Sequence, residues 1–153
     1  MLNEYINKVK KERLTREECF NFSKQVACML CANDTQQQLA RDAIIQVLDN
    51  FNNVFHREIW GDLVESAGFF PYIDEFEIRN ASSLLRYAHH KSDHISKVFH
   101  SKQKELSNLI LSGKNVIVSA PTSFGKSLLI EEIVASGKYK NIVIIQPTTG
   151  IVR

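Results

Sequence analysis

The sequence has few cysteines, and they do not form a complete zinc-binding pattern. The three are Cys19, Cys28 and Cys31, so a single Cys-x-x-Cys pair is present. A structural zinc site needs four ligands, usually from two such pairs, and the histidines within residues 89–100 do not follow a zinc spacing. A redox Cys-x-x-Cys normally opens a helix after a strand, whereas this pair ends a helical pattern. We therefore interpret the cysteines as helix-face residues in a reducing compartment.

The sequence also lacks the segments that membrane and exported proteins carry. No apolar run approaches the roughly 20 residues of a membrane span. The first residues, from Met1 to Tyr5, contain an acid and no apolar core, so they do not resemble a signal peptide. Internal repeats and low-complexity segments are absent as well. We predict a cytoplasmic globular protein that does not contact a membrane, and its 153 residues allow one domain or a small domain with part of another.

The charge of the chain is small overall but unevenly distributed. Residues 1–98 contain 12 Lys and Arg against 14 Asp and Glu, whereas residues 99–153 contain 7 against 3. The second part is therefore the basic one, which suits an anionic ligand there. The excess is too mild to demonstrate binding of nucleic acid.

The pattern of residues 1–95 predicts an all-helical leader domain. Thr15 and Glu18 have the spacing of a capping box at the start of a helix. Apolar residues then recur at helical spacing, and Leu84, Leu85 and Ala88 are expected to face inward in the last helix of this part. The predicted helices cover residues 15–32, 34–51, 56–66 and 81–89.

Residues 96–153 have a different pattern, and the boundary is expected in the polar connector 91–98. A helix is predicted over 102–112. The runs 115–119 and 141–145 are continuously apolar and β-branched, which is typical of strands buried on both faces. A helix over 126–136 lies between them. The order strand, loop, helix, strand is one βαβ unit, so the predicted fold class is α/β, with a parallel sheet following the helical leader.

The loop between the first predicted strand and its helix has the composition of a phosphate-binding loop. Backbone N–H groups that converge at a helix N-terminus suit an anionic phosphate. Gly125 permits close approach, Lys126 can place its ammonium on the β- and γ-phosphates, and Ser127 can offer a hydroxyl to Mg²⁺. The alternative is a chance Gly-Lys-Ser in a strand–helix turn. The predicted nucleotide-binding residues are Ala120, Pro121, Thr122, Ser123, Phe124, Gly125, Lys126 and Ser127.

The arrangement Ala-x-Thr-x-x-Gly-Lys-Ser resembles motif I of the superfamily 2 helicases, the DEAD/DEAH-like group, and within it the Ski2-like lineage. The resemblance covers about residues 99–153 and implies a RecA-like parallel sheet, with ATP and Mg²⁺ as cofactors and Lys126 in a catalytic role. Gln103 lies 17 residues before Ala120 and resembles the glutamine of the family's Q motif, which reads the adenine edge. An exposed helix residue is the alternative for Gln103.

Pro147 and Thr148 close the second predicted strand, where these helicases begin motif Ia. The resemblance implies that the two residues contact phosphates of a DNA or RNA single strand, which gives affinity without sequence choice. An ordinary turn after a strand is the alternative. The leader, with His56 to Trp60 and then Phe-Phe-Pro-Tyr, is similar to leader domains on bacterial defence-associated helicases such as the Hachiman type. A protein partner for the leader is therefore also expected.

A working helicase has further parts that this sequence lacks. An Asp-Glu pair after a third strand would hold Mg²⁺, and arginines from a second RecA-like domain would stabilise transferred charge. Asp74-Glu75 precedes the loop, so its order excludes that role. We expect an N-terminal fragment that binds ATP without turnover or unwinding. The alternatives are another P-loop enzyme, such as a kinase or AAA-type ATPase, and a non-catalytic helical interaction module with a remnant loop.

Overall fold

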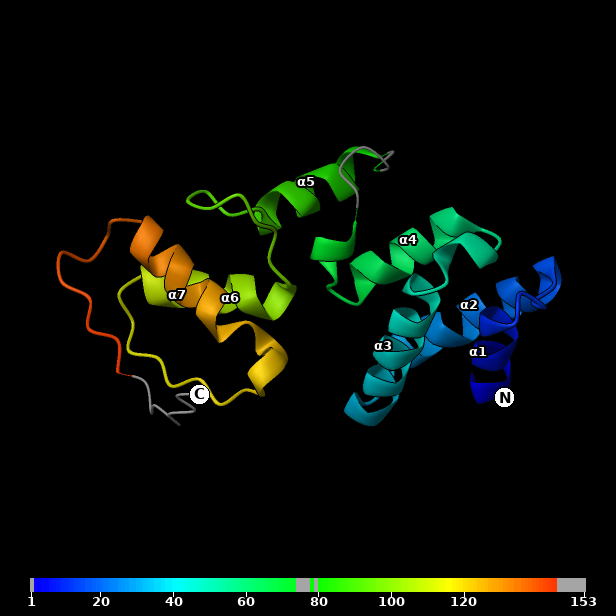
Figure 1. The fold of residues 1–153 in the computed structure, drawn as a ribbon. Helices are drawn as coiled ribbons and strands as arrows, with labels where there is room; N and C mark the ends of the chain where they lie inside the picture. Colours follow the sequence, from blue (N-terminus) through cyan, green and yellow to red (C-terminus); the bar gives the residue numbers. More distant parts are fainter. Residues whose placement is uncertain (1, 74–77, 79, 146–153) are drawn as a thin grey trace, which may run out of the picture. The chain divides into compact units, whose positions relative to one another are not determined.

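Seven α-helices form the regular structure of the residues that the computed structural model describes, namely 2–73, 78 and 80–145 (Figure 1). The chain divides into two compact units, residues 1–90 and residues 91–153. Among the helices of the described part, none combines the length and the apolar character that crossing a bilayer requires.

The first unit is a bundle of helices whose starts are fixed by polar caps. Thr15 accepts a hydrogen bond from the N–H of Glu18, and the Glu18 carboxylate accepts one from the N–H of Thr15, which confirms the predicted capping box. Asn33 caps the next helix through the N–H of Gln36. The helices are α1 (Leu2–Lys10), α2 (Arg16–Leu30), α3 (Asp34–Leu48), α4 (Arg57–Ser66) and α5 (Ala81–His90), with 3₁₀ turns η1 (Phe51–Asn53) and η2 (Phe70–Tyr72).

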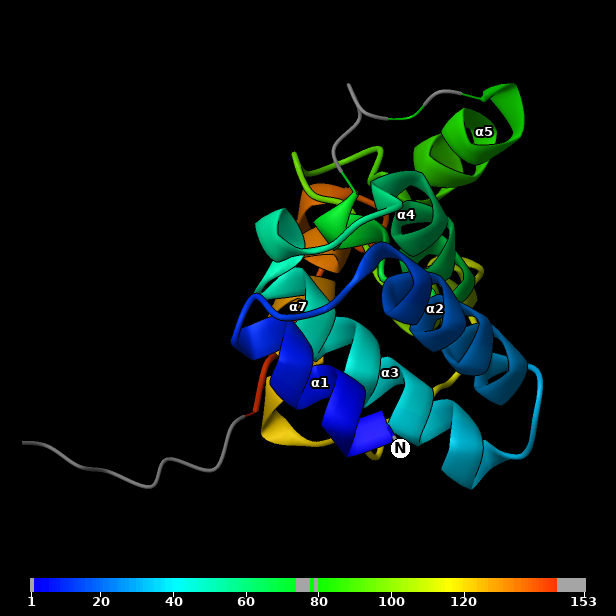
Figure 2. The ribbon, with the colours of Figure 1, turned by 90° about the vertical axis from the view of Figure 1, so that its right-hand side faces the viewer.

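The core of this unit is formed where α1, α2, α3 and α4 pack together (Figure 2). Trp60 is fully buried, and its ring centroid lies 5.0 Å from that of Phe22, which in turn stacks on Tyr5 at 5.2 Å. The Trp60 indole Nε1 donates to Cys19 Sγ over 3.4 Å, so the polar end of the indole has a partner inside the core. Cys19, Phe22 and Val26 are fully buried, as their helical spacing predicts.

A polar contact joins α1 to the start of α2. The Lys8 ammonium donates to Glu18 Oε1 over 2.7 Å, and Thr15 donates to the other carboxylate oxygen from its N–H and its hydroxyl. These bonds, that from Lys8 first, lower the pKa of Glu18 from 4.5 to about 2. The Glu18 carboxylate in turn raises the pKa of Lys8.

The lowered pKa of Glu18 gives the fold a defined acid sensitivity. Because the folded state binds the Glu18 proton more weakly than the unfolded state, the contribution is fully present above about pH 4.5. It is lost as the pH falls from there towards the folded pKa of about 2. Urea unfolding across this range is expected to show a smaller loss of stability for Glu18→Gln than for the wild type. An identical acid dependence of the two proteins would contradict the assignment.

The buried face of α5 differs from the prediction. Leu84 and Leu85 are 45% and 72% exposed and Ala88 is exposed, whereas Ser83 and Tyr87 are buried. Both the predicted residues and the buried pair Ser83 and Tyr87 fit the helical period. Spacing alone therefore does not decide which face of the helix is buried. The Ser83 N–H donates to Asn80 Oδ1 over 2.7 Å, which is a capping contact at the start of the helix.

The second unit contains α6 (Ser101–Leu111), the 3₁₀ turn η4 (Thr122–Phe124) and α7 (Lys126–Ala135). α6 packs against α7, and the Tyr139 hydroxyl donates to Ile110 O over 2.6 Å. The buried Glu132 of α7 accepts a short hydrogen bond from the Ser92 hydroxyl, which itself accepts from the N–H groups of His94 and Ile95. This network ties the polar stretch before α6 to the helical pair.

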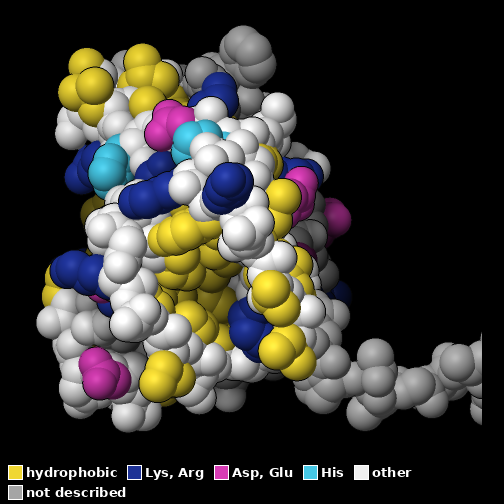
Figure 3. All heavy atoms as spheres, turned by 90° about the vertical axis from the view of Figure 1, so that its left-hand side faces the viewer, with side chains coloured by type: hydrophobic (Ala, Val, Ile, Leu, Met, Phe, Trp, Pro, Cys, Tyr) yellow, Lys and Arg dark blue, Asp and Glu magenta, His cyan; other side chains and the backbone are white. Residues whose placement is uncertain are grey.

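The predicted α/β fold, with a RecA-like parallel sheet, is wrong for the residues described. The segments 115–119 and 141–145 contain no strand, and one isolated bridge, between Lys91 and Val98, is the β-structure found in the described part. Ile117 is fully exposed, and Val143 and Ile145 are 84% and 89% exposed. Figure 3, in which the left-hand side of Figure 1 faces the viewer, shows hydrophobic side chains (yellow) open to solvent. A parallel strand forms only with neighbouring strands and a covering layer on each face, which these described segments do not have.

Candidate functional site

The segment from Ala120 to Ser127 forms a tight loop that leads directly into α7. Phe124 N–H donates to Pro121 O over 3.1 Å within η4, and Gly125 then adopts φ +84° before the helix begins at Lys126. This left-handed conformation is one that glycine adopts without a steric cost, as the loop pattern requires. The N–H groups of Leu128 and Leu129 donate to Gly125 O, which starts the helix.

The first turn of α7 has the features of an anion site. It contains no acidic residue, and the N–H groups of Lys126 and Ser127 donate to no other described residue. Such free N–H groups at a helix start carry partial positive charge and attract anions. The Ser127 side chain is exposed, and its hydroxyl makes no hydrogen bond within the described residues.

The side chain of Lys126 folds back over the loop. Its ammonium donates to Ala120 O and to Pro121 O, each over 2.7 Å. An ammonium has three donors, so one remains for a further acceptor at the mouth of the loop. The Lys126 ammonium is therefore held against the backbone at the start of the loop.

Gln103 contacts the loop, but its amide bonds to the protein backbone, whereas the sequence predicts that it reads an adenine edge. The side chain is buried; its Nε2 donates to Phe124 O over 2.7 Å and its Oε1 accepts from His100 N–H over 2.9 Å. Both ends of the amide thus have partners within the chain, and an adenine edge would compete with them. Sequence spacing gives no signal for this contact, because Gln103 and Phe124 lie 21 positions apart. Phe99 is fully buried and so belongs to the packing of this unit.

The remaining predicted site residues are distributed around the loop or lie beyond the described part. Ser123 is exposed and Phe124 is half-buried. The side chain of Thr122 and the whole of Pro147 and Thr148 lie outside the described residues. Within the part of the chain that is described, no three His, Cys, Asp or Glu side chains gather as a metal site, and Cys28 and Cys31 are exposed free thiols.

Comparison with known proteins points to a family through the first unit. The model of the family described as "Anti-bacteriophage protein B N-terminal domain" matches residues 1–84. Anti-bacteriophage protein B of Escherichia coli (strain K12) is 32% identical over 145 residues, which is 92% of this chain and 20% of that protein. The chain thus spans about one fifth of the length of this relative. No solved structure matches.

These comparisons correct the family prediction made from the loop. They match the chain to an anti-bacteriophage protein domain, and they replace its interpretation as a fragment of a superfamily 2 helicase or as another P-loop ATPase. The described fold agrees with the correction, because it is helical and lacks the parallel sheet of a RecA-like domain. The loop motif gave a wrong family because small residues followed by Gly-Lys-Ser can open a helix without the parallel sheet of a RecA-like domain.

Proposed function

We propose that this chain, which belongs to the anti-bacteriophage protein B N-terminal domain family, acts in the defence of a bacterial cell against bacteriophage. The observation that carries the proposal is the family match over residues 1–84, which coincides with most of the first compact unit. The matched residues include the fully buried Phe22 and Trp60, so the match lies on a folded helical core.

Plating efficiency tests this function. Bacteria that express the protein containing this chain, and the same bacteria with an empty vector, are infected with serial dilutions of a panel of phages. We expect fewer plaques on the expressing cells for at least one phage, with equal growth of the two cultures in the absence of phage. Equal plaque numbers for every phage of the panel would contradict the proposal.

A second proposal concerns the loop of the second unit: that it binds the phosphates of ATP together with Mg²⁺. It is supported by the free N–H groups at the start of α7, the left-handed Gly125 and the Lys126 ammonium over the loop. Ser127 is the residue that would offer Mg²⁺ a hydroxyl, and the ion would neutralise part of the phosphate charge. The binding of phosphates needs only these groups, so this proposal does not depend on any turnover.

Removing the Lys126 ammonium is expected to weaken binding of a fluorescent ATP analogue about 10- to 100-fold, because a hydrogen bond to a charged group contributes roughly 1.5–3 kcal/mol. The matched control is Lys140→Ala, which removes the same charge from an exposed residue outside the loop. Fluorescence anisotropy with and without Mg²⁺ gives the affinities. Equal affinities of Lys126→Ala and Lys140→Ala, or no binding by the wild type, would contradict the proposal.

A further inference from the structure

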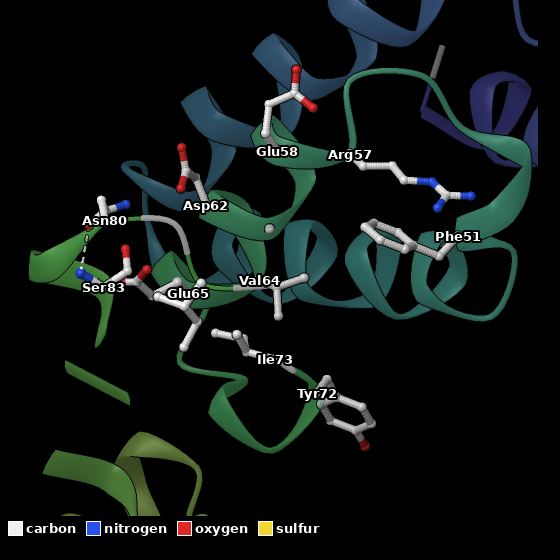
Figure 4. A pocket seen from close by; sticks show the side chains of 12 residues that line it. Phe51, Arg57, Glu58, Asp62, Val64, Glu65, Tyr72, Ile73, Asn80 and Ser83 are labelled. Carbon is white, nitrogen blue, oxygen red and sulfur yellow. Dashed lines mark hydrogen bonds between the residues drawn. The ribbon is translucent and has the colours of Figure 1, made fainter. Parts of the chain in front are cut away.

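The first unit contains a cavity of about 370 Å³ beside α4 (Figure 4). Its other walls come from η1, from the residues at the end of η2, and from the start of α5. Phe51, Val64 and Ile73 give it apolar surface, and Asn80 and Ser83 give it polar groups. A hollow of this size with mixed walls suits a small ligand or one side chain of a partner.

The wall formed by α4 is acidic. Glu58, Asp62 and Glu65 stand four and three positions apart, so they share one face of the helix and all line the cavity. Glu65 is nearly buried and pairs with the guanidinium of Arg86. Glu58 and Asp62 are exposed and form no ion pair with another residue of the described part. Among the described residues, the cavity therefore presents two carboxylates whose charge no ion pair balances.

Arg57 also lines the cavity, but its guanidinium contacts Phe51 and Asn52. The Arg57 guanidinium lies 5.6 Å from the centre of the Phe51 ring and donates to Asn52 Oδ1 over 3.0 Å. Figure 4 shows Arg57 beside Phe51, on a different part of the rim from Asp62. The guanidinium of Arg57 therefore already covers one face of the Phe51 ring.

Gly61 in the middle of α4 leaves the cavity open. Glycine inside a helix lowers helix stability relative to alanine, so such a residue normally has a packing reason. A Cβ placed on Gly61 would meet no atom within 4 Å, so the described part of the chain shows no packing reason for a glycine here. Gly61 lines the cavity between Glu58 and Asp62. The absent side chain is explained if an outside group approaches the helix backbone at this place.

We propose that this cavity binds an arginine side chain from a basic peptide segment of a partner protein. A planar guanidinium can pair with carboxylates such as Glu58 and Asp62 while its face and its aliphatic stem pack on aromatic and aliphatic walls. The bare helix backbone at Gly61 makes room for that stem. The same carboxylates repel phosphate, so a nucleic acid does not fit this cavity. The inference rests on the first unit alone and is independent of the loop of the second unit.

Three blocked tripeptides test the chemistry of the occupant. The ¹⁵N-labelled chain is titrated with acetylated, amidated Gly-Arg-Gly and with its lysine and citrulline counterparts, and amide shifts are followed by NMR. We expect the arginine peptide to shift the amides of α4 and of residues 80–83, with weaker effects from lysine and none from citrulline. If the citrulline peptide caused equal shifts, the positive charge would not matter for binding and the proposal would be contradicted. Equal shifts with the lysine peptide would contradict the assignment to arginine.

Variants locate the binding in the cavity. The double variant Glu58→Gln, Asp62→Asn is expected to weaken binding of the arginine peptide at least about tenfold, since both charge-assisted contacts are lost. Glu131→Gln, at an exposed acid of the other unit, is the control for net charge. Gly61→Leu fills the cavity and should abolish the shifts, whereas Gly61→Ala, which favours the helix, should keep a measurable part of them. Unchanged binding by the double variant would overturn the proposal even if Gly61→Leu did not fold.

Discussion

Truncation of Trp60 to alanine is expected to lower the stability of the first unit by about 3–5 kcal/mol, because it leaves a cavity where the largest fully buried side chain stood. The change also removes the ring contact with Phe22 and leaves Cys19 Sγ without its indole donor. The stability of a whole domain is typically about 5–15 kcal/mol, so a loss of this size takes up much of it. We expect an unfolding midpoint far below that of the wild type.

Urea unfolding followed by far-UV circular dichroism measures this effect, since Trp60 is the single tryptophan and its removal also removes the fluorescence probe. The matched control is Leu85→Ala, a change at a 72% exposed position that should alter stability by no more than about 0.5 kcal/mol. A large loss of stability in Leu85→Ala with little loss in Trp60→Ala would contradict the burial of Trp60 and the exposure of Leu85.

Replacement of Gly125 by alanine is expected to disrupt the loop more than the same replacement at Gly113. The two glycines have nearly equal left-handed angles, φ +84° and +83°, so the cost of the angle, about 1–2 kcal/mol, is common to both. A Cβ on Gly125 would also lie 2.5 Å from Gln103 Nε2, whereas one on Gly113 meets nothing within 4 Å. The Gln103 amide must then leave Phe124 O, which adds about 1–3 kcal/mol for a buried polar group that loses its partner.

Hydrogen exchange of the amides of α6 and α7 gives the stability of this part in each variant. The double variant Gly125→Ala, Gln103→Ala should lose less than the sum of the two single changes, because the clash disappears with the glutamine side chain. Additive effects, or equal effects of Gly125→Ala and Gly113→Ala, would contradict the contact between Gln103 and the loop.

The parts of the fold that could be predicted from the sequence are those set by local signals. The reciprocal side-chain bonds of Thr15 and Glu18 depend on a spacing of three residues, and the buried stripe of Cys19, Phe22 and Val26 depends on the helical period. The helix α1 went unpredicted although Leu2, Ile6 and Val9 recur at helical spacing. Its nine residues are too few for a strong pattern, and tertiary packing stabilises it.

The remaining features depend on contacts that the sequence does not display. The β-branched run around Ile117 suits a buried strand, but a strand also requires partners, which pattern alone does not supply. In the candidate site, Gly125 and Lys126 stand at the helix start as their motif predicts. The hydrogen bond from the Gln103 amide to Phe124 O, by contrast, joins two segments that lie far apart in the chain. The cavity beside Gly61 likewise forms from four separate segments, and an isolated glycine in a helix does not predict it.

We propose that defence against phage depends on the folded first unit, residues 1–90, of which the family model matches residues 1–84. The most direct test is the plating efficiency of phage on cells that express the wild-type protein, Trp60→Ala or Leu85→Ala at matched levels. We predict protection by the wild type and by Leu85→Ala, and its loss with Trp60→Ala. Full protection by Trp60→Ala, with the first unit shown to be unfolded, would contradict the claim.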